Sequence, residues 1–123
     1  MKKFAFSDLR LKNSSLFSDT LKKGRRFESP NFLIYVLSIA DNSAFKIGIL
    51  TNKEVGTAFR RNRIKRLVRE FFRLNRERII KGVVFLIKPK SKCKAEDYKD
   101  VREEFEKLFY KKNLFSDDRP SMD

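Results

Sequence analysis

The sequence predicts a single α+β domain, an α-β-β-α-β-α sandwich of helices packed around a small central sheet. Two long segments, residues 57–75 and 95–112, repeat apolar residues at the spacing of an amphipathic helix. Three shorter runs, residues 32–40, 45–51 and 83–88, are rich in the β-branched and aromatic residues that favour strands. No internal repeat or domain linker interrupts the 123 residues, a length that suits one domain.

The N-terminal part is expected to hold a basic arm followed by a short helix. Residues 1–13 show no clear apolar period, so we expect a weakly ordered arm. Ser14 and Ser15 can cap a helix that runs to about Lys23, because serine oxygens accept the N–H groups of a first helical turn. Gly24 then ends this helix.

The first two predicted strands are expected to form a hairpin. Residues 32–40 carry apolar groups on both faces, so this strand should be covered on both sides. Residues 41–43 are Asp-Asn-Ser, which is typical of a turn, and they would join this strand to residues 45–51. Another turn, Ser-Pro-Asn at residues 29–31, precedes the pair.

The C-terminal part is expected to be a helix followed by a frayed end. The helix at residues 95–112 has a mixed-charge outer face, with six acids and two bases between residues 96 and 106. From residue 116 onward the chain is polar. We therefore divide the chain into an arm at 1–13, a single domain at 14–115 and a disordered tail at 116–123.

The charge balance is the strongest functional signal in the composition. Thirty Lys and Arg against sixteen Asp and Glu give a formal net charge of +14 at pH 7. Such a charge favours a polyanionic partner, which is nucleic acid, an anionic membrane surface or an acidic protein. The chain has no His and one Cys, which excludes His-based catalysis, an internal disulfide and the usual zinc sites. No apolar run is long enough to span a bilayer, and we expect a cytoplasmic protein.

Much of the positive charge lies on the long central helix and just after it. Residues 60–81 hold ten Lys or Arg and two Glu, which contribute +8 of the total +14. At about 100° per residue, the side expected to face the sheet consists of Ile64, Leu67, Val68, Phe71, Phe72 and Leu74. The side expected to point outward consists of Asn62, Lys65, Arg66, Arg69 and Arg73. Glu70 is close in helical spacing to both Arg66 and Arg73, so we expect it to pair with both.

A helix face of nearly one sign favours nucleic-acid binding over a merely solvated surface, because it repels itself unless an anion covers it. Membrane binding is less favoured, since the apolar side is needed for the core. A DNA-binding helix-turn-helix is disfavoured because a strand precedes the long helix. A metal-dependent nuclease is disfavoured because eight of the sixteen acids spread over residues 96–118 instead of clustering. A ribosomal protein is the closest alternative, since it would share the charge and the α+β build.

The long helix begins with a recognisable string of residues. Residues 61–70 read RNRIKRLVRE, and they follow a strand and a K-x-x-G-x-A loop at residues 53–58. This combination closely resembles the signature of the bacterial ribonuclease P protein family. The resemblance extends over roughly residues 9–109 and includes the LKKGRR segment at residues 21–26.

The resemblance implies an α/β sandwich whose crossover through the long helix is left-handed, a fold of the kind found in the second domain of ribosomal protein S5. It also implies that residues 14–115 are an RNA-binding domain whose basic helix faces the catalytic ribonuclease P RNA. The residues expected to contact RNA are Lys53, Arg61, Asn62, Arg63, Lys65, Arg66, Arg69 and Arg73.

The resemblance further implies a cleft between the first helix and the sheet that binds the single-stranded 5′ leader of precursor tRNA. Phe17, Leu21 and Tyr35 match the positions of this cleft. For Phe17 and Tyr35 packing in the core is an equal alternative, and for Leu21 it is the favoured one. Two positions depart from the family pattern: Glu54 replaces a usual base, and Leu21 stands where an aromatic residue is common.

In this family the RNA subunit hydrolyses the phosphodiester bond with bound Mg²⁺. The resemblance therefore implies a protein with no catalytic residue and no tightly bound metal of its own. It implies one protein monomer on each catalytic RNA, with no small-molecule substrate.

Overall fold

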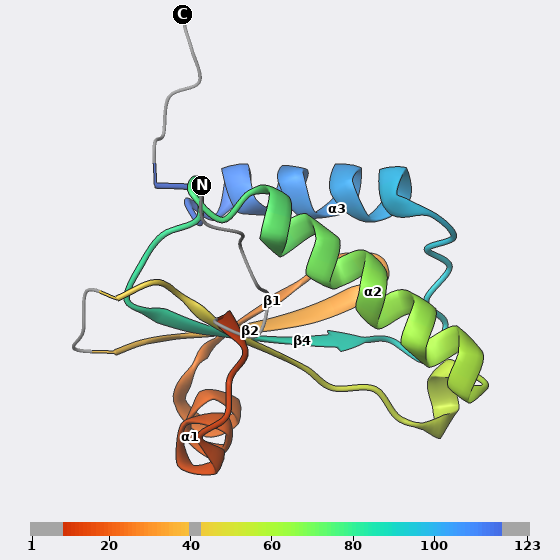
Figure 1. Cartoon of the computed structure of the whole chain (residues 1–123), viewed down its shortest axis with the longest axis horizontal. Coiled ribbons are helices and arrows are strands. Elements are labelled where there is room, and N and C mark those ends of the chain that lie inside the picture. The colour runs from red at the N-terminus through yellow and green to blue at the C-terminus, as the bar shows by residue number, and fades with distance from the viewer. Residues whose placement is uncertain (1–8, 40–42, 117–123) are drawn as a thin grey trace, which may run out of the picture.

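The computed structural model describes residues 9–39 and 43–116 (Figure 1). Within these ranges the chain forms three α-helices, four strands and one short 3₁₀ helix. Their bounds are α1 Ser14–Lys23, β1 Arg25–Glu28, β2 Phe32–Ser38, β3 Lys46–Ile49, η2 Lys53–Val55, α2 Ala58–Leu74, β4 Val83–Pro89 and α3 Tyr98–Lys111. This confirms the α+β class, with one strand more than expected; most of the predicted tail, residues 117–123, lies outside the described part.

The four strands form one sheet in the order β1-β2-β4-β3. β2 is antiparallel to both of its neighbours, whereas β3 and β4 are parallel. The expected hairpin between β2 and β3 is therefore wrong, because β4 lies between them. The hairpin joins β1 to β2 instead, through the turn at residues 29–31, and of the turn predicted at residues 41–43 only the last residue is described.

β1 is the strand that the sequence pattern does not predict. Its four residues, Arg-Arg-Phe-Glu, include a single apolar side chain, and three of the four are exposed. Phe27 packs against the core, while Arg26 and Glu28 alternate to the other face of this edge strand. One apolar residue in four is too little alternation to distinguish a strand from a polar loop.

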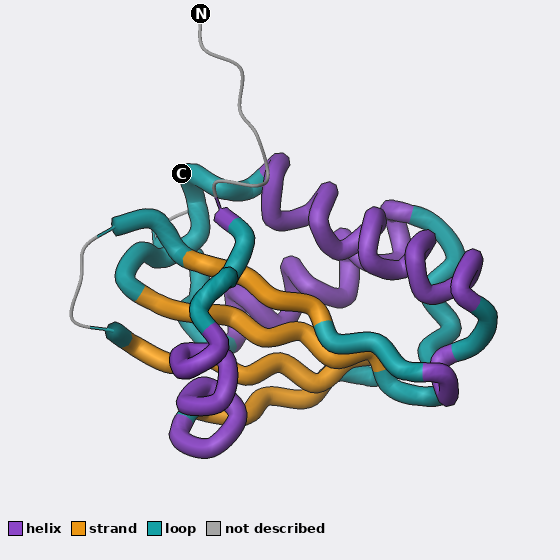
Figure 2. Tube along the Cα trace, turned by 60° about the horizontal axis from the view of Figure 1, so that its bottom comes forward, coloured by secondary structure: helices purple, strands orange, loops and turns teal. Residues whose placement is uncertain are grey.

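β3, α2 and β4 form a crossover between parallel strands. Figures 1 and 2 together show the two strands running in the same direction, with α2 over one face of the sheet and β3 at the sheet edge. The sense of this crossover is left-handed, as the resemblance implies and against the usual rule for such units.

Residues 9–11 pair with the outer edge of β3. Arg10 forms a parallel bridge with Ile47, and the Leu11 N–H donates to the Ile47 carbonyl (2.9 Å). Leu9 is only 4% exposed. This part of the expected arm thus belongs to the folded unit and covers a sheet edge that would otherwise lack partners. Residues 1–8 lie outside the described part.

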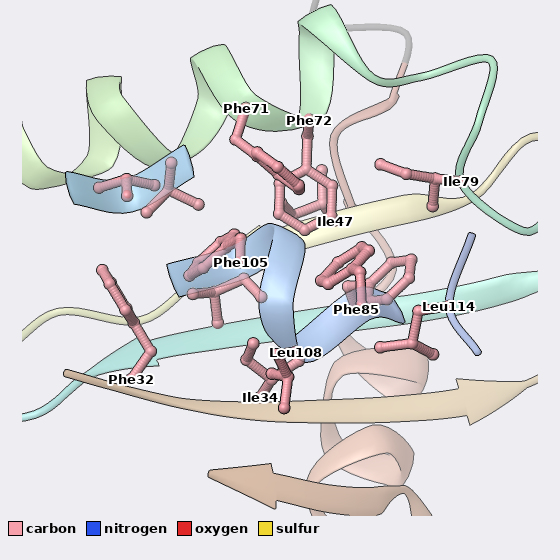
Figure 3. Packing of buried hydrophobic residues seen from close by; sticks show 14 of the residues in the cluster. Phe32, Ile34, Ile47, Phe71, Phe72, Ile79, Phe85, Phe105, Leu108 and Leu114 are labelled. Carbon is pink, nitrogen blue, oxygen red and sulfur yellow. The ribbon is translucent and has the colours of Figure 1, made fainter. Parts of the chain in front are cut away.

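Helices cover both faces of the sheet, but unequally. α2 and α3 lie over one face and α1 lies on the other (Figures 1 and 2). The layer under α2 and α3 is the main core, part of which Figure 3 shows, and its fully buried rings are Phe32, Phe45, Phe71, Phe72, Phe85, Phe105 and Phe109. On the α1 face, Leu33, Tyr35 and Leu37 of β2 stay half-buried. β2 is therefore fully covered on one face only, in contrast to the prediction.

Two helix starts differ from the sequence prediction. Asn13, and not Ser14 or Ser15, caps α1, because its Oδ1 accepts the N–H groups of Ser15 (2.9 Å) and Leu16 (3.1 Å). α3 begins at Tyr98 instead of near residue 95, because Asp97 and Asp100 form a reciprocal capping box there.

Leu74 is the one member of the predicted apolar side of α2 that the core does not take up. It is 53% exposed, whereas Ile64, Val68, Phe71 and Phe72 are all 0% exposed. Leu74 lies in the last turn of α2 and about 60° around the helix from Phe71, which places it at the edge of the apolar stripe.

Candidate nucleic-acid interface

A tight loop fixes the start of the basic helix. Asn52 Oδ1 accepts the Glu54 N–H (3.0 Å) and begins η2, and Gly56 ends it with a φ of 139°. A residue with a Cβ would be strained at this φ, so the chain needs glycine at the entry to α2. Thr57 then caps α2, its Oγ1 accepting an N–H of the first turn (3.2 Å). Lys53 lies exposed in this loop, next to the helix start.

α2 turns one side to the core and the other to solvent. The buried side is the apolar stripe described above, and the opposite side carries the predicted polar residues. We call the surface formed by Asn62, Lys65, Arg66, Arg69 and Arg73 the basic face of α2. Asn62 and Arg66 are exposed, and Lys65, Arg69 and Arg73 are half-buried at its margins.

Three arginines near the start of α2 hold backbone carbonyls. Arg60 donates to the carbonyls of Cys93 (2.8 Å) and Ala95 (3.1 Å), and Arg63 donates twice to the Glu96 carbonyl (3.2 and 2.6 Å). These bonds tie α2 to the segment that leads into α3. Arg61 donates in the same way to the Gly56 carbonyl (3.0 Å).

The structural role of Arg60 was not predicted, because no periodicity shows which loop will lie beside the helix. Arg61 and Arg63, both expected to contact RNA, are each oriented by these bonds. A guanidinium has five N–H donors, so each keeps donors for a further acceptor.

Glu70 pairs with one of its two expected partners. Arg73 donates to both carboxylate oxygens of Glu70, from Nε to Oε1 (3.1 Å) and from Nη2 to Oε2 (2.6 Å). This pairing raises the pKa of the Arg73 guanidinium, which stays charged. The expected pair between Glu70 and Arg66 is not formed within the described residues. Within the described residues Arg66 makes no ion pair, so its charge points to solvent at the centre of the basic face.

A hollow of about 160 Å³ connects the basic face to α1. Phe17 of α1 lines it together with Lys65 and Arg69 of α2, and residues of β3 and of the 9–11 segment form its floor: Arg10, Leu11, Ile47, Gly48 and Ile49. Figure 2 shows α1 and α2 on opposite faces of the sheet. Because residues of both helices and of the edge strand β3 line the hollow, it lies at the β3 edge of the sheet. The structure therefore brings together two groups of predicted site residues that are far apart in the sequence.

Gly48, in the floor of this hollow, leaves room for Leu86. A Cβ at position 48 would lie 3.6 Å from Phe17 Cε2 and 2.8 Å from Leu86 Cδ2. The second distance is shorter than real Cβ contacts, and Leu86 is fully buried. A side chain here would displace Leu86 and would reach ordinary contact distance from Phe17, so the packing of Leu86 under the hollow depends on glycine.

The other two predicted cleft residues lie on the same side of the molecule but not in this hollow. Tyr35 is half-buried on the α1 face, in one cross-strand row with Leu86 and Gly48. Leu21 is 40% exposed on α1, so it does not pack in the core as the favoured alternative had it. Phe17 is half-buried.

A second hollow, of about 350 Å³, lies beside Leu33 on the α1 face of the sheet. Three lysines of the stretch that ends β4 line it: Lys88, Lys90 and Lys92. Lys90 also pairs with Glu28, and Glu54 lines the same hollow. These lysines were not predicted as site residues, although their alternation after a buried strand is a signal that the sequence contains.

A third hollow, of about 580 Å³, lies between the β1–β2 turn and α3. Its lining mixes acidic and basic residues, and one of the acids, Glu104, accepts hydrogen bonds from the β1–β2 turn. Glu104 accepts from Ser29 Oγ, from the Asn31 N–H (2.7 Å) and from Asn31 Nδ2 (2.8 Å). Glu104 therefore holds the β1–β2 turn in place. The lining of this hollow lacks the single-signed charge of the basic face.

The described residues, 9–39 and 43–116, hold neither a cluster of metal-ligating side chains nor a membrane-spanning helix. No three His, Cys, Asp or Glu side chains gather there in a group that could hold a metal ion. No helix there has both the length and the apolar character needed to cross a membrane.

Comparison with known proteins agrees with this geometry. A family model described as Ribonuclease P matches residues 7–113. The ribonuclease P protein component of Dictyoglomus turgidum is 36% identical over 108 residues, which cover 85% of this chain and 89% of that protein. The corresponding protein of Clostridium acetobutylicum is 31% identical over 106 residues, with 85% and 89% covered.

Solved structures give the same result. The RNase P protein from Thermotoga maritima superimposes with a TM-score of 0.72 at 30% identity, covering 80% of this chain and 93% of that one. A Staphylococcus aureus RNase P protein mutant gives a TM-score of 0.80 at 24% identity, with 89% and 92% covered, and supports the fold alone. Because the family model spans most of the sequence and relatives above 30% identity cover most of it, the chain belongs to the ribonuclease P protein family.

Proposed function

We propose that this chain is the protein subunit of a ribonuclease P ribonucleoprotein. It binds the catalytic RNA through the basic face of α2 and the 5′ leader of precursor tRNA through the α1 side of the sheet. In this way it assists removal of the leader by the RNA. The observation that carries the proposal is the shared hollow, which Phe17 of α1 lines together with Lys65 and Arg69 of α2.

Charge neutralisation is the main physical contribution under this proposal. The catalytic RNA and the precursor tRNA are both polyanions and repel each other. A chain with a net charge of +14 between them reduces that repulsion. Each phosphate that it neutralises releases a counterion, so the affinity falls steeply as salt is added. Arginine suits this task because its planar fork donates two parallel hydrogen bonds to a phosphate.

The leader would lie along the α1 side of the sheet. Phe17 and Tyr35 offer partly exposed rings there, and any unpaired base can stack on a ring, so binding needs little sequence preference. Lys88 and Lys92 offer cations for the leader phosphates in the neighbouring hollow. Mature tRNA has no leader, so these contacts favour the substrate over the product.

Magnesium enters this proposal with the RNA. Bound Mg²⁺ supplies an activated water and stabilises the leaving oxygen in phosphodiester hydrolysis. Four carboxylates of this chain have structural roles: Glu70 pairs with Arg73, Glu104 holds the β1–β2 turn, and Asp97 and Asp100 cap α3. The chain's own residues therefore bind and orient RNA, one chain on each catalytic RNA, in the cytoplasm.

Cleavage of a precursor tRNA at low Mg²⁺ tests the proposal. A bacterial ribonuclease P RNA, this protein, and the two together are each incubated with the precursor. We expect cleavage at the mature 5′ end with the two together, and almost none with either alone. A protein that neither binds nor activates the RNA would refute the proposal and favour a ribosomal role.

A further inference from the structure

Phe59 is an aromatic side chain that is exposed and lies outside the core. It is 80% exposed, compared with 40% for Leu21, 53% for Leu74 and 48% for Tyr110, the other exposed large hydrophobic residues of the described part. Its ring makes no aromatic contact there and does not belong to the core cluster. The other phenylalanines of α2, Phe71 and Phe72, are fully buried.

The position of Phe59 on α2 explains why it stays exposed. It lies in the first turn, about 180° around the helix from the buried Val68. Arg66 lies two turns further on within about 20° of the same line, and Arg63 lies within about 40°. The ring is therefore at the N-terminal end of the basic face, in the middle of its outward side.

Local structure gives no reason for phenylalanine at this place. Aromatic residues form helices less readily than alanine, lysine or arginine, so the helix itself does not favour the ring. An uncovered ring also leaves apolar area in water. What covers it must be flat and apolar and must also tolerate a cationic border.

An unpaired nucleobase meets both conditions. Its π face stacks on an aromatic ring, and its own phosphates carry the negative charge that the neighbouring cations require. The Arg63 guanidinium, one turn further along the helix, is oriented by its two bonds to the Glu96 carbonyl, so a phosphate would meet a preoriented donor. A second copy of this chain fits poorly, because it would bring the same positive charge to the contact.

We propose that Phe59 stacks on an unpaired base of the ribonuclease P RNA, while Arg63 and Arg66 hold the adjoining phosphates. This inference rests on the proposed function and adds a stacking site to it. The basic face of α2 then reads RNA in two ways: its cations bind the backbone anywhere, and Phe59 requires a base that is out of a duplex at one place.

Substitution of Phe59 separates stacking from a general apolar contact. Phe59→Ala and Phe59→Leu should both weaken binding to a bacterial ribonuclease P RNA by about 5- to 100-fold, because neither has a flat ring. Phe59→Tyr should bind like the wild type. The thermal midpoint should not fall in any of the three, since the ring is 80% exposed and lies outside the core, and alanine and leucine form helices at least as readily as phenylalanine. Binding to a fully paired RNA duplex should be the same for all four proteins.

Fluorescence gives a direct signal, because the chain contains no tryptophan. Phe59→Trp places a single indole at the proposed stack, and RNA should quench its emission. Leu74→Trp, at the other end of the same helix, is the matched control and should be quenched little.

Three outcomes would overturn the inference. The first is unchanged RNA affinity of Phe59→Ala. The second is full affinity of Phe59→Leu, which would indicate an apolar contact with something other than a base. The third is equal quenching at positions 59 and 74. If the wild-type chain does not bind this RNA at all, the proposed function fails together with the stack; normal wild-type binding with a silent Phe59→Ala refutes the stack alone.

Discussion

Phe17 of α1 and Lys65 of α2 line the same hollow, although their helices belong to opposite layers of the sheet. They meet around the edge strand β3, which is four residues long and has Gly48 on the α1 face. An aromatic ring and a cation are thus available to one strand of RNA at the place where two groups of predicted contacts meet.

Reversing two charges of the basic face should weaken assembly with the catalytic RNA. Arg66→Glu with Arg69→Glu is expected to lower the affinity at least about tenfold and to reduce the slope of affinity against salt by up to about two. The matched control is Lys99→Glu with Arg102→Glu on α3, which changes the net charge equally. Filter binding at several salt concentrations measures both, and equal losses would show that only total charge matters.

Filling the floor of the hollow should destabilise the fold. In Gly48→Ala the new Cβ would meet the buried Leu86, so we expect the free energy of unfolding to fall by about 1–3 kcal/mol. Urea denaturation measures the stability, with Ser18→Ala on the exposed side of α1 as the control. An unchanged midpoint would mean that the hollow is looser than the structure indicates.

Removing the carboxylate of Glu104 should loosen the β1–β2 turn. Glu104→Ala leaves the donors of Ser29 and Asn31 without their acceptor, which should cost about 1–3 kcal/mol of stability. Glu103→Ala is the matched control: its side chain is 59% exposed, with ion contacts of only 3.9–4.0 Å, and the loss should be below about 0.5 kcal/mol. Thermal denaturation compares the two, and equal losses would contradict the assigned role of Glu104.

The thiol of Cys93 should react slowly. Burial raises the pKa of this thiol above its ordinary value, against the opposing effects of a backbone hydrogen bond at Ala95 and the charge of Arg60. The thiolate is the reactive form, and at pH 8 a smaller fraction of Cys93 than of a free thiol is in this form. The rate of reaction should therefore keep rising with pH over a range where the rate of a free thiol has already levelled off. Alkylation by iodoacetamide measures this. A Cys93→Ser, Ser91→Cys double variant, with an exposed thiol two residues away, should react much faster; equal rates would contradict the shift.

Local sequence rules predicted α2 closely. Thr57 is a good cap, Ile64 and Val68 lie on one apolar stripe, and Asn75 ends the helix at the expected residue. These signals are close in the sequence and depend on helical geometry alone, which is why they could be read without a structure.

Contacts between distant segments could not be read in this way. The partner of β3 depends on which strand enters the middle of the sheet, and the turn-like residues 41–43 gave a misleading local signal. The bonds from Arg60 and Arg63 depend on where the 93–96 segment passes. The partner of Glu70 could not be predicted either, because helical spacing places both Arg66 and Arg73 within reach and the structure pairs it with Arg73.

The most direct test of the joint site is the affinity of the reconstituted holoenzyme for precursor tRNA and for mature tRNA. The wild-type protein should give tighter binding of the precursor. Phe17→Ala should weaken precursor binding by about 5- to 100-fold and leave mature tRNA binding unchanged, because only the precursor has a leader to stack on the ring. Phe17→Leu, which keeps the apolar volume, controls for folding and should show the same selective loss. An equal loss for both tRNAs, or no loss for either, would contradict the placement of the leader beside Phe17.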